Sequence, residues 1–152
     1  WMVLSGPYGS GKSHLAYATA AAFLGAGHAA YISTVPDLLE ALRRGLDREA
    51  DASYEQRYDA LCRAELLVLD DLGAQNDSAW ATEKLYQIID YRYRSRLPLM
   101  VTTNINPFAP GGRLDPRIIS RLLDGANVSG GFTQVHLLTS GHYRQRTALR
   151  GR

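Results

Sequence analysis

Short apolar runs alternate along the chain with longer segments in which apolar residues recur every three or four positions. Residues 66–69 read Leu-Leu-Val-Leu, a continuous apolar run typical of a strand that is buried on both faces of a parallel sheet. In residues 79–94, Leu85, Ile88 and Ile89 follow helical spacing. An alternation of this kind predicts an α/β fold, in which helices cover a parallel sheet.

Glycine and capping residues mark the ends of these segments. Gly25 and Gly27 end the first helical pattern, and Asn76, Asp77 and Ser78 offer N-cap side chains to a later one. The predicted strands are residues 2–4, 29–33, 66–69, 99–103 and 134–138. The predicted helices are residues 12–24, 36–44, 54–63, 79–94 and 116–123.

The chain has 152 residues, of which 45% are hydrophobic, and a domain of this size buries roughly 70% of its unfolded surface. We therefore expect residues 1–152 to form a single domain.

The lone cysteine, Cys62, permits neither an internal disulfide nor a cysteine-based zinc site, so we expect a cytoplasmic protein. No apolar run approaches the ~20 residues of a membrane span and no cleavable leader is recognised, so we expect no membrane association. Because the chain begins at Trp1 inside a predicted strand, we expect a fragment that lacks its N-terminal flank.

Charge is distributed unevenly along the chain. From Pro110 onward seven arginines against two aspartates give +5, which leaves −3 for the first 109 residues. A basic end of this kind is typical of a surface that meets nucleic acid or phosphate, although a solvated basic face gives the same pattern. The arginines are Arg113, Arg117, Arg121, Arg144, Arg146, Arg150 and Arg152.

The strongest motif is G-x-x-x-x-G-K-[ST], which occupies residues 6–13 between a predicted strand and a predicted helix. In such a loop, glycines let successive backbone N–H groups point inward around phosphate oxygens, in conformations that a Cβ would obstruct. Lys12 supplies a mobile charge for the β- and γ-phosphates, and the Ser13 hydroxyl can ligate Mg²⁺. A plain glycine-rich turn is the alternative. The residues expected to bind the nucleotide are Gly6, Pro7, Tyr8, Gly9, Ser10, Gly11, Lys12 and Ser13.

Two aspartates follow the apolar run at residues 66–69 and are expected at the carboxyl edge of the sheet, where ligands bind in open α/β folds. A nucleotide loop needs a carboxylate opposite it to anchor Mg²⁺ or its water shell, and Asp70 supplies one. Asp71 is placed to orient or deprotonate an attacking water. Taken alone, two aspartates after a strand also fit a turn or a helix cap.

Two further groups of polar residues are candidates for the same site. Thr102, Thr103 and Asn104 end the next strand along the chain, and Asn104 can hold a water through a neutral hydrogen bond, with a strand-ending turn as the alternative. Arg117 and Arg121 are four residues apart and share one helix face. Because neither has an acidic partner four residues away, we expect both to be free to meet phosphate, in the same molecule or in a neighbour. A solvated helix face is the alternative.

Taken in order, the strings GPYGSGKSHLA, LLVLDDLGAQ, WATEKLYQIIDYRY, LMVTTN and DPRIISRL, followed by a last strand and HYR, resemble the bacterial replicative-helicase loader family of the DnaC/DnaI type. They are also similar to the IstB-type transposition helper ATPases, and both groups belong to the AAA+ ATPases. The resemblance spans residues 4–144. It implies a P-loop NTPase fold with a five-stranded parallel AAA+ core of strand order 5-1-4-3-2, flanked by helices and without a C-terminal helical lid.

The resemblance also implies roles for single residues. Asn104 is the first sensor and Arg121 is the arginine finger. His14 matches the family pattern next to the loop and is therefore added to the residues expected to bind the nucleotide, without a catalytic role. Most AAA+ proteins carry glutamate where this chain has Asp71, which favours slow or partner-dependent hydrolysis. The implied catalytic residues are Asp71, Asn104, Arg121 and Arg117, and the implied metal ligands are Ser13 and Asp70.

The function implied by the resemblance is ATP-dependent helicase loading. ATP and Mg²⁺ are the expected cofactors, and the expected assembly is a head-to-tail homo-oligomer that holds single-stranded DNA and a replicative DNA helicase. A transposition helper with a transposase as partner is one alternative, and a weakly hydrolysing, nucleotide-gated binding module is another. A P-loop kinase is disfavoured by the Thr-Thr-Asn strand and by the arginines that follow it.

Overall fold

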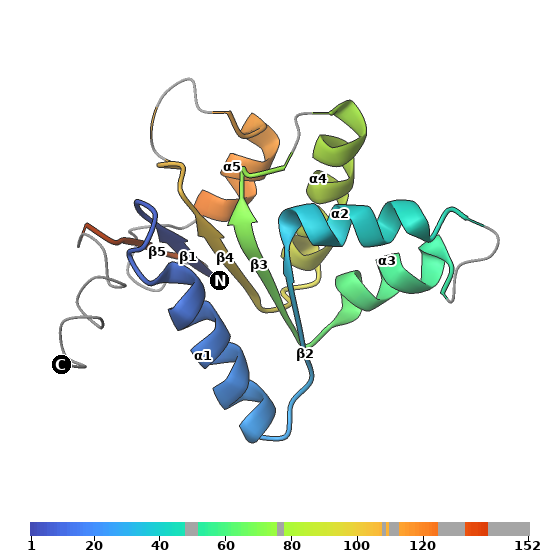
Figure 1. The fold of residues 1–152 in the computed structure, drawn as a ribbon, viewed down its shortest axis with the longest axis horizontal. Coiled ribbons are helices and arrows are strands. Elements are labelled where there is room, and N and C mark those ends of the chain that lie inside the picture. The colour runs from blue at the N-terminus through green and yellow to red at the C-terminus, as the bar shows by residue number, and fades with distance from the viewer. Residues whose placement is uncertain (48–51, 76–77, 108, 110–112, 125–132, 140–152) are drawn as a thin grey trace, which may run out of the picture.

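The computed structural model describes residues 1–47, 52–75, 78–107, 109, 113–124 and 133–139. Five parallel strands form one sheet in the order β2-β3-β4-β1-β5 (Figure 1). Counted from the other edge, this is the predicted order 5-1-4-3-2, which is therefore confirmed. The strands are β1 (Met2–Ser5), β2 (Ala30–Thr34), β3 (Leu66–Leu72), β4 (Leu99–Thr103) and β5 (Gln134–Leu137).

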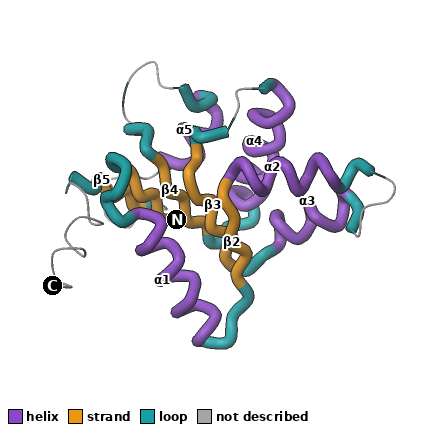
Figure 2. Tube along the Cα trace, viewed as in Figure 1, coloured by secondary structure: helices purple, strands orange, loops and turns teal. Residues whose placement is uncertain are grey.

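Five helices cover the two faces of the sheet. They are α1 (Lys12–Gly25), α2 (Val35–Arg44), α3 (Tyr54–Arg63), α4 (Ala79–Arg94) and α5 (Pro116–Leu123). Within the described part of the chain, α1 is the one helix on its face of the sheet (Figure 2). Ala16 and Ala20 let it approach Leu4 and Val68 closely. The other four helices build the larger core on the opposite face, against strand residues such as Leu67. All ten predicted elements are present, so the α/β prediction is confirmed.

The helices differ in how they begin. α2, α3, α4 and α5 each start at a side chain that accepts a hydrogen bond from the first turn, and these caps are Thr34, Ser53, Ser78 and Asp115. α1 begins instead after Gly11, whose φ is 95°, and it has no side-chain cap. Its first N–H groups are therefore not claimed by a capping residue. Asn76 and Asp77, the other predicted caps of α4, lie outside the described residues.

One element differs from its prediction in a way that bears on the site. β3 does not end before the two aspartates but continues through them to Leu72, with a register shift against β4 between Leu69 and Leu72. A β-bulge adds an extra residue to one strand and re-aims the side chains there, so the pairing resumes beyond it.

Some expectations fall on residues that the structure does not describe. The absence of a helical lid concerns residues 140–152, and Arg144, Arg146, Arg150 and Arg152 of the basic end lie in the same stretch. Within the described ranges, no helix is long and apolar enough to cross a membrane.

Arg92 joins α3, α4 and β4 from a position with no exposed surface. Its guanidinium donates hydrogen bonds to the carbonyl oxygens of Leu61, Cys62, Ala64 and Pro98, at 2.9, 3.1, 2.9 and 2.5 Å. Three of these carbonyls lie at the end of α3, where unpaired acceptors and the negative end of the helix dipole favour a cation. Burial lowers the pKa of Arg92 to about 10, so the side chain stays charged at neutral pH.

We expect Arg92→Met to lower the free energy of unfolding by about 3 kcal/mol, because four carbonyl oxygens lose the hydrogen bond that the guanidinium donates to them. Urea unfolding followed by circular dichroism measures the change. The control is Arg63→Met at the end of α3, where the side chain is exposed; it should shift the free energy by less than about 0.5 kcal/mol. Equal losses in the two variants would contradict the joining role of Arg92.

Candidate functional site

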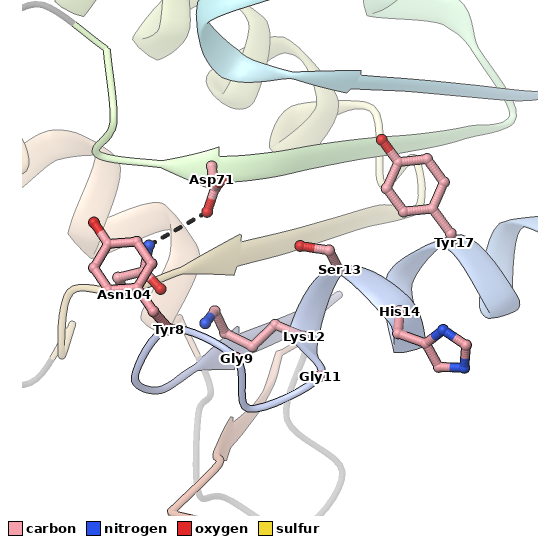
Figure 3. A pocket seen from close by; sticks show the side chains of 9 residues that line it. All are labelled: Tyr8, Gly9, Gly11, Lys12, Ser13, His14, Tyr17, Asp71 and Asn104. Atoms are coloured by element: carbon pink, nitrogen blue, oxygen red, sulfur yellow. Dashed lines mark hydrogen bonds between the residues drawn. The ribbon is translucent and has the colours of Figure 1, made fainter. Parts of the chain in front are cut away.

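A cavity of about 440 Å³ opens at the carboxyl edge of the sheet, between the loop after β1, the end of β3 and the end of β4. Figure 3 shows Lys12 at the start of α1, and Asp71 and Asn104 at the ends of β3 and β4, around this space. The structure thus brings together residues that lie up to about ninety positions apart in sequence. The cavity is lined by Tyr8, Gly9, Gly11, Lys12, Ser13, His14, Tyr17, Asp71 and Asn104.

Most of the predicted nucleotide residues meet at this cavity. Gly6, Pro7 and Ser10 belong to the same loop but are not among the lining residues. Tyr17 lines the cavity although it was not predicted to do so. It follows Ser13 by four positions on α1 and so shares its helix face, which is the signal in the sequence that points to it.

The glycines of the loop serve two different purposes. Gly9 and Gly11 have φ values of 77° and 95°, in a backbone region that residues with a Cβ rarely adopt. Gly6 is needed for a reason that the motif alone does not give. A Cβ at Gly6 would lie 2.4 Å from the carbonyl oxygen of Leu138, just after β5. Gly6 therefore lets the loop leave β1 in close contact with the neighbouring strand.

Lys12 is held inside the loop that it follows. Its amine donates hydrogen bonds to the carbonyl oxygens of Gly6 and Pro7 at 3.0 and 2.9 Å, and the residue is only 5% exposed. Burial lowers the pKa of Lys12 below its ordinary value, and the charges of Asp71 and Asp70 oppose that shift. The amine therefore lies within the electrostatic reach of both carboxylates.

Asp71 and Asn104 form a pair on the side of the cavity opposite the loop. The side-chain amide of Asn104 donates a hydrogen bond to Asp71 Oδ1 at 3.3 Å. Asn104 Oδ1 is buried, and no described residue gives it a hydrogen bond. A carboxylate next to an unsatisfied amide oxygen suits a water molecule, which can donate to both.

The side chains that could coordinate a divalent cation suit Mg²⁺ better than a transition metal. The Ser13 hydroxyl lies on the cavity, and the carboxylate of Asp70, on the neighbouring strand β3, is buried to 5% exposure. Among the described residues there is no group of three or more His, Cys, Asp or Glu side chains that could cage a metal. Mg²⁺ suits such a sparse set, since it takes oxygen ligands and commonly binds through one or two carboxylates together with substrate phosphates.

The expectation that Arg117 and Arg121 are free is wrong, because both are paired across the interface between α5 and α4. Arg121 Nε donates to Asp90 Oδ1 at 2.9 Å. Arg117 Nη2 contacts Glu83 Oε2 at 3.2 Å and Asp115 Oδ2 at 3.0 Å. The hydrogen bond to Asp90 raises the pKa of Arg121, and the hydrogen bond to Asp115 raises the pKa of Arg117. Spacing along α5 does not reveal these partners, because Asp90 and Glu83 lie on α4.

The two arginines lie in matching surroundings. The guanidinium of Arg117 lies 4.2 Å from the ring centre of Tyr86, and that of Arg121 lies 4.9 Å from the ring centre of Tyr93. Each tyrosine follows its carboxylate by three positions on α4, and the two sets are seven positions apart. The repeat of a carboxylate followed three positions later by a tyrosine is therefore the pattern in the sequence that points to the surroundings of the two arginines. Neither arginine is among the residues that line the cavity of its own chain.

The comparisons with known sequences agree with this geometry. The IstB-like ATP binding protein family matches residues 1–125. The replicative helicase loader DnaC of Escherichia coli (strain K12) is 33% identical over 120 residues, which cover 79% of this chain and 49% of the loader. A putative insertion sequence ATP-binding protein of Sinorhizobium fredii is 34% identical over 118 residues, which cover 76% of this chain and 37% of the relative. The chain spans about half the length, or less, of these curated relatives.

Solved structures show the same fold. The crystal structure of the DnaC helicase loader matches with a TM-score of 0.70 at 27% identity, over 91% of this chain and 76% of that chain. AMPPCP-bound DnaA from Aquifex aeolicus matches with a TM-score of 0.74 at 19% identity, over 90% of this chain and 39% of that chain. The prediction of a P-loop AAA+ core and the resemblance to loaders and transposition helpers are confirmed.

Gly6→Ala should weaken nucleotide binding and lower the free energy of unfolding by about 2 kcal/mol, because the added Cβ forces β5 away from the loop. Gly25→Ala adds the same atom at the end of α1, where nothing lies within 4 Å, and should leave both quantities nearly unchanged. Titration with a fluorescent ADP analogue and urea unfolding measure the two effects. Similar behaviour of the two variants would contradict the close-packing role of Gly6.

Proposed function

The chain belongs to the family of IstB-like ATP binding proteins. We propose that it binds and hydrolyses ATP with Mg²⁺ as the AAA+ domain of a helicase-loader-like protein, which assembles head to tail on single-stranded DNA and loads the replicative DNA helicase. The observation that carries this proposal is the meeting of Lys12, Asp71 and Asn104 at one cavity beside an uncapped helix N-terminus. Residues 1–152 act as one AAA+ ATPase domain.

Each residue of the cavity has a role in this proposal. The backbone of residues 6–14, together with the Lys12 amine, holds the phosphates at the positive end of α1. Ser13 and Asp70 would hold Mg²⁺, which when bound neutralises charge on the transferring phosphoryl group. Asn104 and Asp71 orient a water for attack on the γ-phosphorus. Asp71 takes a proton from this water as the bond to the β-phosphate breaks, which releases ADP and phosphate.

Arg121 acts on the nucleotide of a neighbouring copy, with Arg117 beside it. Two observations support a role between subunits: neither arginine lines its own cavity, and both side chains stay partly exposed, Arg121 at 33% and Arg117 at 49%. A contact between a cavity on one copy and an arginine face on the next is heterologous, so repeated copies build a ring or an open helix.

The partners follow from the relatives. The loaders among them favour a replicative DNA helicase. Support for single-stranded DNA comes from one neighbouring structure, a replication initiator bound to AMPPCP and single-stranded DNA. The insertion-sequence relative favours a second candidate, a transposition helper that works with a transposase on duplex DNA. The chemistry of the cavity is the same in both.

Mixing two inactive variants tests the role of Arg121 between subunits. Lys12→Ala and Arg121→Ala should each abolish most ATP turnover, the first by loss of phosphate binding and the second by loss of the arginine supplied to the neighbour. An equimolar mixture should recover about a quarter of the wild-type turnover, because one neighbouring pair in four combines an intact loop with an intact arginine. Steady-state phosphate release measures the turnover.

The mixture has its own control. The combined variant Lys12→Ala/Arg121→Ala, mixed with Arg121→Ala, supplies intact loops but no arginine, so it should stay inactive. If the first mixture is no more active than this one, Arg121 does not act between subunits.

Turnover per wild-type subunit should also rise steeply with protein concentration, since the complete site forms only on assembly.

Stimulation by DNA separates the two candidate functions. A single-stranded oligonucleotide should stimulate ATP turnover more than a duplex of the same sequence, and the stimulation should fall steeply between about 50 and about 200 mM salt as phosphate contacts are lost. Phosphate release measured with each DNA at each salt concentration provides the test. Stronger stimulation by the duplex would favour the transposition helper, and a response that is insensitive to salt would contradict a DNA contact through basic residues.

A further inference from the structure

The register between β3 and β4 shifts at the two aspartates, Asp70 and Asp71. The pairs on either side of the shift are Leu69 with Val101 and Leu72 with Thr103. Between these pairs β3 has two residues, Asp70 and Asp71, whereas β4 has one, Thr102. Two residues opposite one is the arrangement of a β-bulge. Thr102 therefore faces both acidic residues at once.

The bulge changes where the acidic side chains can go. In a regular strand successive side chains point to opposite faces of the sheet, which would place Asp70 and Asp71 on opposite sides. Here Asp71 has a φ of 58° and lines the cavity, and the charges of both residues act on the Lys12 amine. A positive φ is unusual for any residue other than glycine, and aspartate tolerates it better than most. The bulge thus brings the Asp71 side chain to the cavity, while the Asp70 carboxylate, which does not line the cavity, stays within electrostatic reach of the same amine.

One hydroxyl group connects the two aspartates. Thr102 has no exposed surface, and its Oγ1 accepts a hydrogen bond from the backbone N–H of Asp71 at 3.0 Å. The same oxygen donates to Asp70 Oδ1 at 2.5 Å. A threonine hydroxyl has a single proton, so the direction of each bond is fixed. The side chain of Asp70 and the backbone of Asp71 are therefore set by the same atom.

We propose that Thr102 is a positioning residue that holds the carboxylate of Asp70 and the backbone of Asp71 in the arrangement that the nucleotide site needs. This inference rests on the proposed function, because it assigns Asp70 to the metal and Asp71 to the water. Groups behind a metal ligand orient that ligand, and their loss commonly weakens metal binding or activity by 10- to 100-fold. Thr102 stands in that relation to Asp70.

The neighbouring threonine provides a matched comparison. Thr103 is equally buried, and its Oγ1 also makes two hydrogen bonds, donating to Leu72 O at 2.7 Å and accepting from Ile105 N at 3.0 Å. It holds the same bulge, and neither of these two hydrogen bonds involves a carboxylate. A loss of structure in the bulge should therefore appear in variants at both positions, whereas a loss of positioning should appear only at Thr102.

The test measures how much Mg²⁺ strengthens binding of a fluorescent ADP analogue to the full chain. We expect Thr102→Val, which keeps the shape and removes the hydroxyl, to reduce this gain about tenfold while leaving binding without Mg²⁺ nearly unchanged. Thr102→Ser keeps the hydroxyl and should preserve the gain, and Thr103→Val should leave it close to that of the wild type. Because the measurement needs no turnover, it tests Thr102 even if the wild-type chain proves not to hydrolyse ATP.

Thr102→Ala and Thr102→Ser give a second comparison, since they differ by one hydroxyl and both lack the methyl group. This comparison replaces the first one if Thr102→Val does not fold. Urea unfolding of each variant shows whether it is folded. In ATP turnover, the alanine variant should lose kcat about tenfold relative to the serine variant, with little change in KM. If Thr102→Val and Thr103→Val lose the Mg²⁺ gain equally, or if serine does not preserve it, Thr102 has only a structural role and the proposal is overturned.

Discussion

A parallel sheet brings the carboxyl ends of its strands to one edge, and the buried polar groups at that edge need partners. β1 lies at the centre of this constraint, between β4 and β5. Gly6 N donates to Thr103 O at 3.2 Å, Leu138 N donates to Ser5 O at 2.7 Å, and the Ser5 hydroxyl donates to Ile105 O at 2.9 Å. The nucleotide loop therefore leaves the sheet from a point that is held on both sides, so its position relative to β4 is fixed before any ligand binds.

The loop then joins this anchor to a helix that has no side-chain cap. The other four described helices use a side chain to satisfy their first turn, whereas α1 begins after Gly11 and turns its N-terminus toward the cavity. The Lys12 amine is bound to carbonyl oxygens of the same loop. Phosphate oxygens offer this amine charged acceptors in place of neutral ones, and charge-assisted hydrogen bonds are the stronger kind. The loop is thus organised without a ligand, and in the proposed function the phosphates would replace contacts that it already makes.

The fold and the main parts of the site follow from the sequence, because apolar spacing, glycines and capping residues are local signals. They place the ten elements, and the loop motif identifies residues 6–13. What the sequence does not reveal depends on contacts between elements. The bulge at Asp70 and Asp71 arises from the pairing of β3 with β4, and the need for glycine at position 6 arises from the approach of Leu138. The assigned roles of the site residues remain predictions.

The pairing of the arginines with α4 shows how such contacts change the meaning of a motif. Arg121 shares Asp90 with Arg94, whose Nε lies 2.9 Å from the other carboxylate oxygen. Partly exposed ion pairs of this kind stabilise a protein by about 0–1 kcal/mol, since water competes for both charges. They are strong enough to favour one side-chain direction but weak enough to be exchanged for a phosphate. An arginine bound in this way is aligned in the separate chain and remains available to a neighbour, which reconciles its pairing with a role between subunits.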